Sequence, residues 1–229
     1  MPAETPMTSP FWPGAAPKSR GAVALVVIDM QVDFCAPGGW IDQLGEDVSA
    51  TRAVIPAIAR VLGAAREAGI HVVHTREGHQ PDLSDLPANK QWRTRVHGLG
   101  IGDAGRDGRI LVRGEPGFEI VPELAPVAGE LVIDKPGKSG FHATTLEDDL
   151  HRLGVTHLVI TGVTSDCCVQ STFRDAFERG FAAAVLEDCT AAVELPNHAA
   201  TIEILKADGG RWGRVSDTRG FLAALEALG

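Results

Sequence analysis

The stretch THLVITGVTSDCCVQSTFRDAFERGFAAAVLED (156–188) predicts a strand, a helix and a second strand in direct succession. Its first seven residues contain the apolar run LVI and are predicted to form a strand. A helix is then predicted as far as Gly180, because glycine commonly ends helices, and 181–188 is a second apolar strand. A helix between two such strands indicates a βαβ unit with parallel strands and a right-handed crossover.

The same alternation continues on both sides of this unit. Further strands are predicted at 22–29, 70–75, 130–135 and 211–216, and helices at 49–68, 145–153, 198–207 and 217–228. Strands that alternate with helices in this way form a parallel sheet covered on both faces. We therefore expect an α/β fold, with a single three-layer α/β/α domain and a six-stranded, mainly parallel, Rossmann-like sheet.

Two segments depart from the alternating pattern. Residues 1–20 are rich in proline and are predicted to form an irregular N-terminal arm, in which the pair Phe11–Trp12 packs on the body of the protein or on a neighbouring subunit. Residues 76–129 form a long excursion rich in glycine and proline, and segments of this length are usually functional lids or contain small elements of their own. The domain itself is predicted to span 21–229.

Composition narrows the classes of partner. The chain has 229 residues, 44% of them hydrophobic and 22% charged, and its net charge is −9. A strong negative charge disfavours nucleic acid and anionic membranes as partners. The four cysteines, at 35, 167, 168 and 189, lack the spacing of a disulfide scaffold, and the N-terminus lacks the apolar core of a signal peptide. We expect free thiols and a cytoplasmic protein.

Several polar residues follow the predicted strands directly. Asp29 ends the first strand, Lys135 ends the strand at 130–135, and Cys167 and Cys168 come shortly after Gly162. Ligands of open parallel sheets bind beyond the carboxyl ends of the strands, so these side chains are expected at one rim. A carboxylate and an ammonium group beside a thiol can promote its ionisation. Each residue also has an ordinary interpretation, as a helix cap, a solvated lysine or a small core residue, and spacing alone does not choose between the two cysteines.

Three separate blocks resemble the signature blocks of the isochorismatase-like cysteine hydrolases. They are LVVIDMQVDF (25–34), IDKPGKSGFHATTLEDDL (133–150) and TGVTSDCCVQSTFRDAFERGF (161–181). Matched position by position, the resemblance implies the catalytic set Asp29, Lys135 and Cys168, with Cys168 as nucleophile. Cys167 then occupies a position that is usually aliphatic, and Lys138 is a less favoured alternative to Lys135.

The resemblance also implies a mechanism and a substrate class. Asp29 would take the thiol proton, and Cys168 would attack a carbonyl to form a thioester. The backbone N–H groups of Thr164 and Cys168 would form the oxyanion hole, and the peptide bond before Thr164 would be cis. The likeness is greatest to the biuret and ureidoacrylate amidohydrolase branch, which implies a small linear amide or ureido substrate and no cofactor.

Other parts of the site are predicted with less support. Phe34, Trp40, Phe141 and also Trp92 are candidates for the wall of a substrate pocket, although each of them suits an ordinary core equally well. Asp208 precedes a Gly-Gly turn near the expected rim, where the resemblance suggests a substrate contact.

Alternative functions remain open from the sequence. They are an amidase for N-carbamoyl amino acids or nicotinamide, and a non-catalytic binding member of the fold. Glu77, His79 and His97 approximate the zinc-ligand spacing of nicotinamidases, but the first ligand would be a glutamate, so we expect no metal. The expected partners are a small-molecule amide and further copies of the chain, in a dimer or tetramer.

The two adjacent thiols can be separated by substitution. We expect Cys168→Ser to abolish turnover without unfolding the protein, because the exchange is nearly isosteric, and Cys167→Val to keep most activity. We also expect the nucleophile to have a depressed thiol pKa and to react rapidly with iodoacetamide near neutral pH. Assays of both variants that gave the reverse pattern, an inactive Cys167 variant and an active Cys168 variant, would show that the third block is wrongly aligned.

Overall fold

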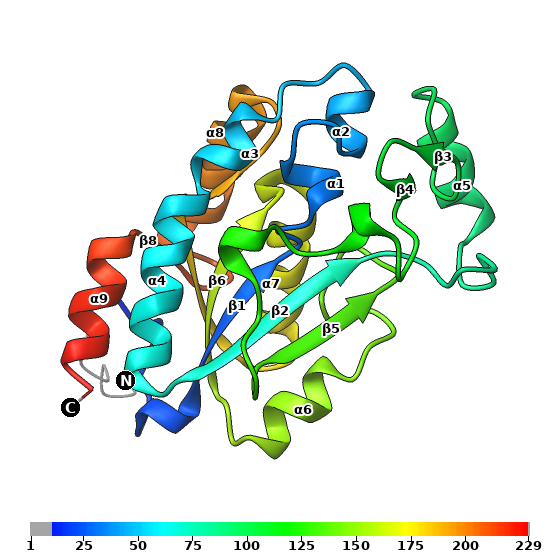
Figure 1. Cartoon of the computed structure of the whole chain (residues 1–229). Coiled ribbons are helices and arrows are strands. Elements are labelled where there is room, and N and C mark those ends of the chain that lie inside the picture. The colour runs from blue at the N-terminus through cyan, green and yellow to red at the C-terminus, as the bar shows by residue number, and fades with distance from the viewer. Residues whose placement is uncertain (1–10, 229) are drawn as a thin grey trace.

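The computed structural model describes residues 11–228 and contains the predicted six-stranded sheet (Figure 1). The strand order is β5–β2–β1–β6–β7–β8, and every neighbouring pair is parallel. The strands are β1 (Val23–Ile28), β2 (His71–Glu77), β5 (Leu131–Lys135), β6 (His157–Val163), β7 (Ala182–Ala191) and β8 (Arg214–Ser216). The order reverses between β1 and β6, and such a switch point is where open α/β sheets bind ligands.

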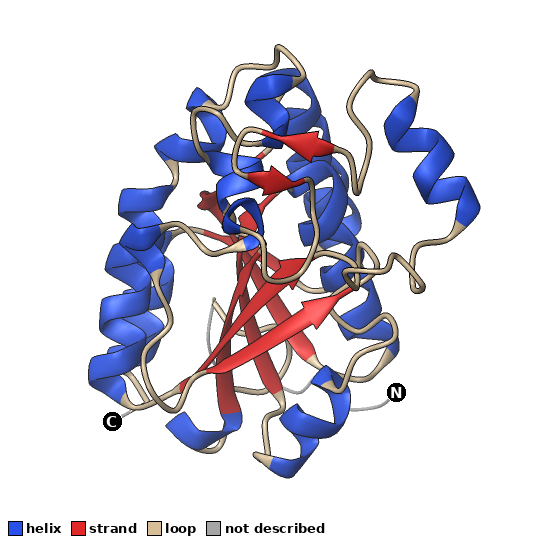
Figure 2. Ribbon diagram, turned by 45° about the vertical axis from the view of Figure 1, so that its right-hand side comes forward, coloured by secondary structure: helices blue, strands red, loops and turns tan. Residues whose placement is uncertain are grey.

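Helices cover both faces of this sheet (Figure 2). The helices are α1 (Val32–Cys35), α2 (Trp40–Gln43), α3 (Ser49–Ala53), α4 (Ile55–Ala68), α5 (Ala88–Arg95), α6 (Leu146–Arg152), α7 (Gln170–Glu178), α8 (Leu195–Lys206) and α9 (Thr218–Glu226). Apolar residues of α4 and α9 pack in one core cluster, and those of α6 and α7 pack in a second. These two clusters confirm the three-layer α/β/α prediction. Within residues 11–228, no helix is long and apolar enough to cross a membrane.

Strand β1 is completely buried and serves both clusters. Its alternate residues face opposite sides, with Val23, Leu25 and Val27 in one cluster and the residues between them in the other. Ile28, its last residue, pairs with Thr75 on one side and Gly162 on the other. A Cβ atom at Gly162 would lie 2.1 Å from the Ile28 carbonyl oxygen, so only glycine allows this close approach.

The excursion over 76–129 holds small elements, as predicted. They are α5, a short antiparallel pair made of β3 (Ala104–Gly105) and β4 (Gly108–Arg109), and two 3₁₀ turns, η2 (Pro116–Phe118) and η3 (Pro122–Leu124). Figures 1 and 2 show that α5 and the β3–β4 pair lie beyond the carboxyl ends of β2 and β5. The excursion is therefore placed at the rim where the sequence predicts the site.

Several predicted boundaries differ from the structure. The helix predicted at 49–68 is divided into α3 and α4 at Val54, where Pro56 follows in the first turn of α4. Proline has no N–H to donate to the preceding turn, so one continuous helix is disfavoured there. Strand β2 extends two residues beyond the predicted end, to Glu77, and the strand predicted at 211–216 is confined to β8.

The described part of the N-terminal arm packs on the body of the protein. Phe11 and Trp12 are buried, and their rings form an edge-to-face pair with a centroid distance of 4.7 Å. Phe11 also contacts Phe221 of α9, and Trp12 contacts His157 of β6. Of the two placements predicted for this pair, the structure shows the one on the body.

Replacing Trp12 with alanine is expected to destabilise the fold. The Trp12 side chain is 1% exposed, and truncation of a buried tryptophan usually costs about 3–5 kcal/mol of unfolding free energy. Urea denaturation of Trp12→Ala measures this loss. Leu195→Ala is the control, because Leu195 is 68% exposed and its loss should change the unfolding free energy by less than about 0.5 kcal/mol. Equal stability of the two variants would refute the assignment of Trp12 to the core.

Candidate active site

A buried ion pair lies at the carboxyl ends of β1 and β5. Lys135 Nζ lies 2.7 Å from Asp29 Oδ2, and both side chains are fully buried. The Thr75 hydroxyl donates to Asp29 Oδ1 at 2.6 Å, and Lys135 Nζ donates to the Gly137 carbonyl at 2.9 Å. Both charged groups are therefore held in one orientation by neighbours on separate segments.

Cys168 completes the set predicted from the sequence. It lies in a π-helical turn, η4 (Ser165–Val169), which follows β6 directly, and the residue is 4% exposed. Its Sγ atom lies within 4.8 Å of carboxylate oxygens of both Asp29 and Glu77. The thiol donates a hydrogen bond to Glu77 Oε2 at 3.2 Å. The structure thus brings Asp29, Lys135 and Cys168 together.

Glu77 belongs to the same cluster, whereas the sequence analysis considered it only as a possible zinc ligand. Its carboxylate is fully buried and contacts three ammonium groups: Lys90 at 2.7 Å, Lys138 at 2.9 Å and Lys135 at 3.6 Å. Glu77 ends β2 and pairs with Lys135 across the β2–β5 ladder. The predicted strand stopped at residue 75, so the sequence analysis placed Glu77 in the loop. With the correct strand end, the strand-end rule that found Asp29 would also have found Glu77.

The cluster contains one ammonium group more than it has carboxylates. Two carboxylates, Asp29 and Glu77, face the ammonium groups of Lys90, Lys135 and Lys138. The Lys138 side chain is 44% exposed, so solvent as well as Glu77 stabilises its charge.

The ammonium groups hold Glu77 in its ionised form. Burial alone would raise the pKa of Glu77, but the charges of Lys138, Lys135 and Lys90 outweigh it and hold that pKa well below its usual range. Burial likewise opposes the charged form of Lys135, yet Asp29 raises the Lys135 pKa above its ordinary value. Glu77 is therefore a weak base and a permanent anion of the site.

The pKa values of the two thiols differ from the prediction, in which the nucleophile has a lowered pKa. The hydrogen bond between the thiols, together with burial, raises the pKa of Cys168 well above its ordinary value. The same hydrogen bond, with help from Lys138, lowers the pKa of Cys167 to about 7. In the resting protein, Cys168 is a neutral thiol, and ionisation of this residue requires transfer of its proton to a neighbouring base.

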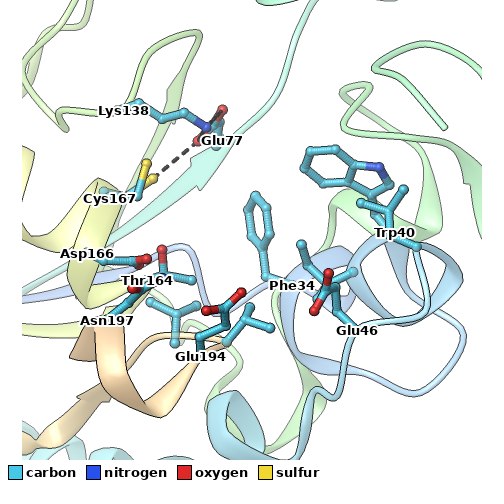
Figure 3. Close-up of a pocket in the computed structure, with 15 residues that line it drawn as sticks. Phe34, Trp40, Glu46, Glu77, Lys138, Thr164, Asp166, Cys167, Glu194 and Asn197 are labelled. Carbon is cyan, nitrogen blue, oxygen red and sulfur yellow. Dashed lines mark hydrogen bonds and ion pairs between the residues drawn. The ribbon is translucent and has the colours of Figure 1, made fainter. Parts of the chain in front are cut away.

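A cavity of about 290 Å³ opens onto the cysteines (Figure 3). Phe34 and Trp40 line it, as predicted, together with Thr164 and both thiol residues. The peptide bond between Val163 and Thr164 is cis, in agreement with the resemblance. Outside the regular helices and strands of residues 11–228, the Thr164 N–H donates to no backbone carbonyl.

Three other predicted pocket residues do not line this cavity. Phe141 lies in the core, where its ring stacks on that of Phe181. Trp92 is exposed on α5, and Asp208 is exposed and forms an ion pair with Arg211. Asp208 has a left-handed backbone conformation just after α8.

The histidines of the suggested zinc motif are not gathered around one point. Glu77 contacts lysines, and His79 Nδ1 forms a hydrogen bond with Asp85 Oδ1 at 3.1 Å. His97, which follows α5, contacts Arg93. Among the described residues, the group that brings three possible metal ligands together is Asp29, Glu77 and Cys168, and Lys135 contacts both of its carboxylates.

The reversed order of thiol pKa values predicts which cysteine is alkylated first. With iodoacetamide near neutral pH, we expect Cys167 to be labelled fastest, because about half of it is thiolate when its pKa is about 7. Cys167→Val should remove the fast phase. Peptide mass spectrometry over a time course distinguishes the sites, and faster labelling of Cys168 than of Cys167 in the native protein would contradict a raised Cys168 pKa.

Comparison with known proteins identifies the family. The Isochorismatase domain family matches residues 23–218. The chain is 36% identical to the ureidoacrylate amidohydrolase RutB of Serratia proteamaculans (strain 568), over 98% of this chain and 91% of the relative. It is also 36% identical to the RutB protein of Methylorubrum extorquens (strain AM1), over 96% of this chain and 90% of the relative.

Solved structures agree with this assignment. A cysteine hydrolase from Pseudomonas syringae pv. phaseolicola shares the fold with a TM-score of 0.79 at 24% identity, over 97% of this chain and all of that one. An isochorismatase family protein from Desulfovibrio vulgaris has a TM-score of 0.71 at 30% identity, over 90% and 97%. N-carbamoylsarcosine amidase from Thermoplasma acidophilum has a TM-score of 0.64 at 26% identity, over 86% and 96%. The matched residues, the sheet order and the site at the switch point agree, and the chain belongs to the isochorismatase family.

Proposed function

We propose that this protein is an amidohydrolase that cleaves a C–N bond of a small linear amide or ureido compound, such as biuret, through a thioester on Cys168. The observation that carries the proposal is the Cys168 thiol at the cavity, beside the buried pair Asp29–Lys135. The hydrolytic amidase class is that of the related amidohydrolases. The cavity volume of about 290 Å³ is at the small end for ligand pockets and suits a small substrate.

Asp29 is the proposed base for the Cys168 thiol. Both carboxylates are close to Sγ, but Glu77 contacts three ammonium groups and Asp29 contacts one, Lys135. Glu77 is thus the weaker base, and its role is to accept the resting thiol hydrogen bond. In the first step the proton passes from Sγ to Asp29 while Sγ forms a bond to the substrate carbonyl carbon.

The carbonyl oxygen becomes an oxyanion in this step. The N–H groups of Thr164 and Cys168 are the proposed donors, because Thr164 lines the cavity beside the nucleophile. Backbone donors fixed before the reaction stabilise such an intermediate without reorganisation. The C–N bond then breaks, and Asp29 returns its proton to the leaving nitrogen, which departs as ammonia or an amine.

Water completes the cycle in the proposed second half. Asp29 takes a proton from a water molecule as its oxygen attacks the thioester carbonyl. The C–S bond breaks, and the proton returns from Asp29 to Sγ. Lys135, whose pKa is raised by Asp29, stays charged throughout and keeps the carboxylate in position.

The setting of the enzyme is a further part of the proposal. We expect it to work in the cytoplasm, where its four unpaired cysteines would stay reduced. We also expect a homo-oligomer, and Trp92 and Val96, both strongly exposed on one side of the α5 segment, support an apolar contact between copies.

Release of ammonia from a panel of amides tests the activity directly. We expect turnover of biuret or another small ureido compound by the native protein and none by Cys168→Ala. Electrospray mass spectrometry after rapid acid quenching should detect the acyl adduct on the Cys168 peptide. Binding of these compounds without hydrolysis would instead favour a non-catalytic member of the fold.

Lys135→Ala is expected to lower kcat by at least about a hundredfold, because it leaves Asp29 buried without its cation. Circular dichroism checks that the variant remains folded. Lys206→Ala is the matched control, since Lys206 pairs with Glu187 on the surface and its loss should leave kcat nearly unchanged. Near-normal kcat in the Lys135 variant would remove this lysine from the mechanism.

A further inference from the structure

The cavity mouth carries three carboxylates that no cation neutralises. Glu46, Asp166 and Glu194 line the cavity, and none of them forms an ion pair within residues 11–228. We propose, resting on the proposed function, that these residues select ureido or amide substrates whose far end is neutral or cationic, and that they exclude substrates with a carboxylate there.

The three acidic residues come from different segments. Glu46 follows α2, Asp166 lies in η4 beside the nucleophile, and Glu194 is the residue before α8. Figure 3 shows Glu46 and Glu194 on either side of Phe34, with Asp166 next to Thr164. Their charges therefore come from three separate segments of the lining and do not form a patch on one helix.

The basic residue of the lining already pairs with a carboxylate. Lys138 Nζ contacts both oxygens of Glu77, at 2.9 and 3.2 Å. His198 is outside the lining, and burial lowers its pKa. Sites that recognise carboxylates normally supply an arginine or lysine whose charge is not already paired in this way.

The remaining wall suits a short apolar linker and a polar but uncharged or positive end. Phe34, Trp40, Ile41, Leu44 and Val193 form the apolar part of the lining. The side chain of Asn197 also lines the cavity and can both donate and accept hydrogen bonds. An ammonium group would be attracted by the three carboxylates, and aromatic faces favour cations as well.

Three ureido compounds of matched length test the selectivity: 3-ureidopropionate, its amide 3-ureidopropionamide and 3-ureidopropylamine. We expect kcat/KM for the amide and the amine to exceed that for the carboxylate by about tenfold or more at low ionic strength. Added salt should reduce this ratio, because it screens charges near the surface. A native enzyme that prefers the carboxylate would overturn the inference while leaving the amidohydrolase activity established.

Substitution tests whether the three acidic residues cause the selectivity. The triple variant Glu46→Gln, Asp166→Asn, Glu194→Gln should raise the carboxylate-to-amine ratio of kcat/KM about threefold to tenfold. Glu203→Gln is the matched control, because Glu203 is an exposed acid on α8 outside the cavity lining, and it should leave the ratio unchanged. An unchanged ratio in the triple variant would refute the assignment.

Alkylation separates this inference from the proposed function. Iodoacetate and iodoacetamide differ in charge, and Cys167 lines the cavity, so their relative labelling rates report the charge at the mouth without any hydrolysis. We expect the iodoacetate-to-iodoacetamide rate ratio at Cys167 to rise in the triple variant and to stay constant in Glu203→Gln. If no ureido or amide compound is hydrolysed, the proposed function fails, and a rate ratio that does not rise in the triple variant refutes charge selection on its own.

Discussion

The ion pair between Lys135 and Asp29 is the constraint on which the site depends. Two fully buried charges 2.7 Å apart are tolerated only while both remain, since loss of one partner of such a pair typically costs about 3–5 kcal/mol. In the sheet β2 lies between β1 and β5, and because these strands are parallel their carboxyl ends lie at one rim. Asp29 follows β1, Lys135 ends β5 and Glu77 ends β2, so all three side chains lie at that rim. Parallel pairing of these three strands thus determines which charges meet.

The cluster places the nucleophile in a neutral resting state. Burial and the hydrogen bond with Cys167 raise the pKa of Cys168, whereas Lys135 opposes that rise. A neutral buried thiol is a weak nucleophile, and in the proposed mechanism its proton moves to Asp29, which pairs with Lys135. The total charge of the cluster then stays constant, so activation of Cys168 depends on proton transfer inside the cluster and not on a depressed pKa of the resting thiol.

The ends of β1 and β5 could be predicted from the sequence because they depend on local pattern, whereas β2 was predicted to end two residues too early. Apolar runs located Asp29 and Lys135, and the family blocks selected Cys168 over Cys167, and the structure brings these residues together. Lys90 could not be found in this way, since it reaches Glu77 from a helix whose position depends on long-range packing. Phe141 was misplaced for a related reason, because an aromatic near a predicted rim suits either a core or a cavity, and only the packed structure distinguishes them.

Residues of the excursion form hydrogen bonds and ion pairs with the residues of the site. Lys90 of α5 donates to the Pro136 carbonyl at 2.6 Å and pairs with Glu77, so it joins the excursion to the segment after β5. Gln31 Nε2 donates to the carbonyls of Glu77 and Phe118, and the Glu77 N–H donates to Gln31 Oε1. Because Gln31 follows Asp29 by two residues, these bonds connect the base, Glu77 and the excursion in one network. Lys90 is one of three cations that lower the pKa of Glu77, so loss of the Lys90–Glu77 contact would raise the basicity of Glu77.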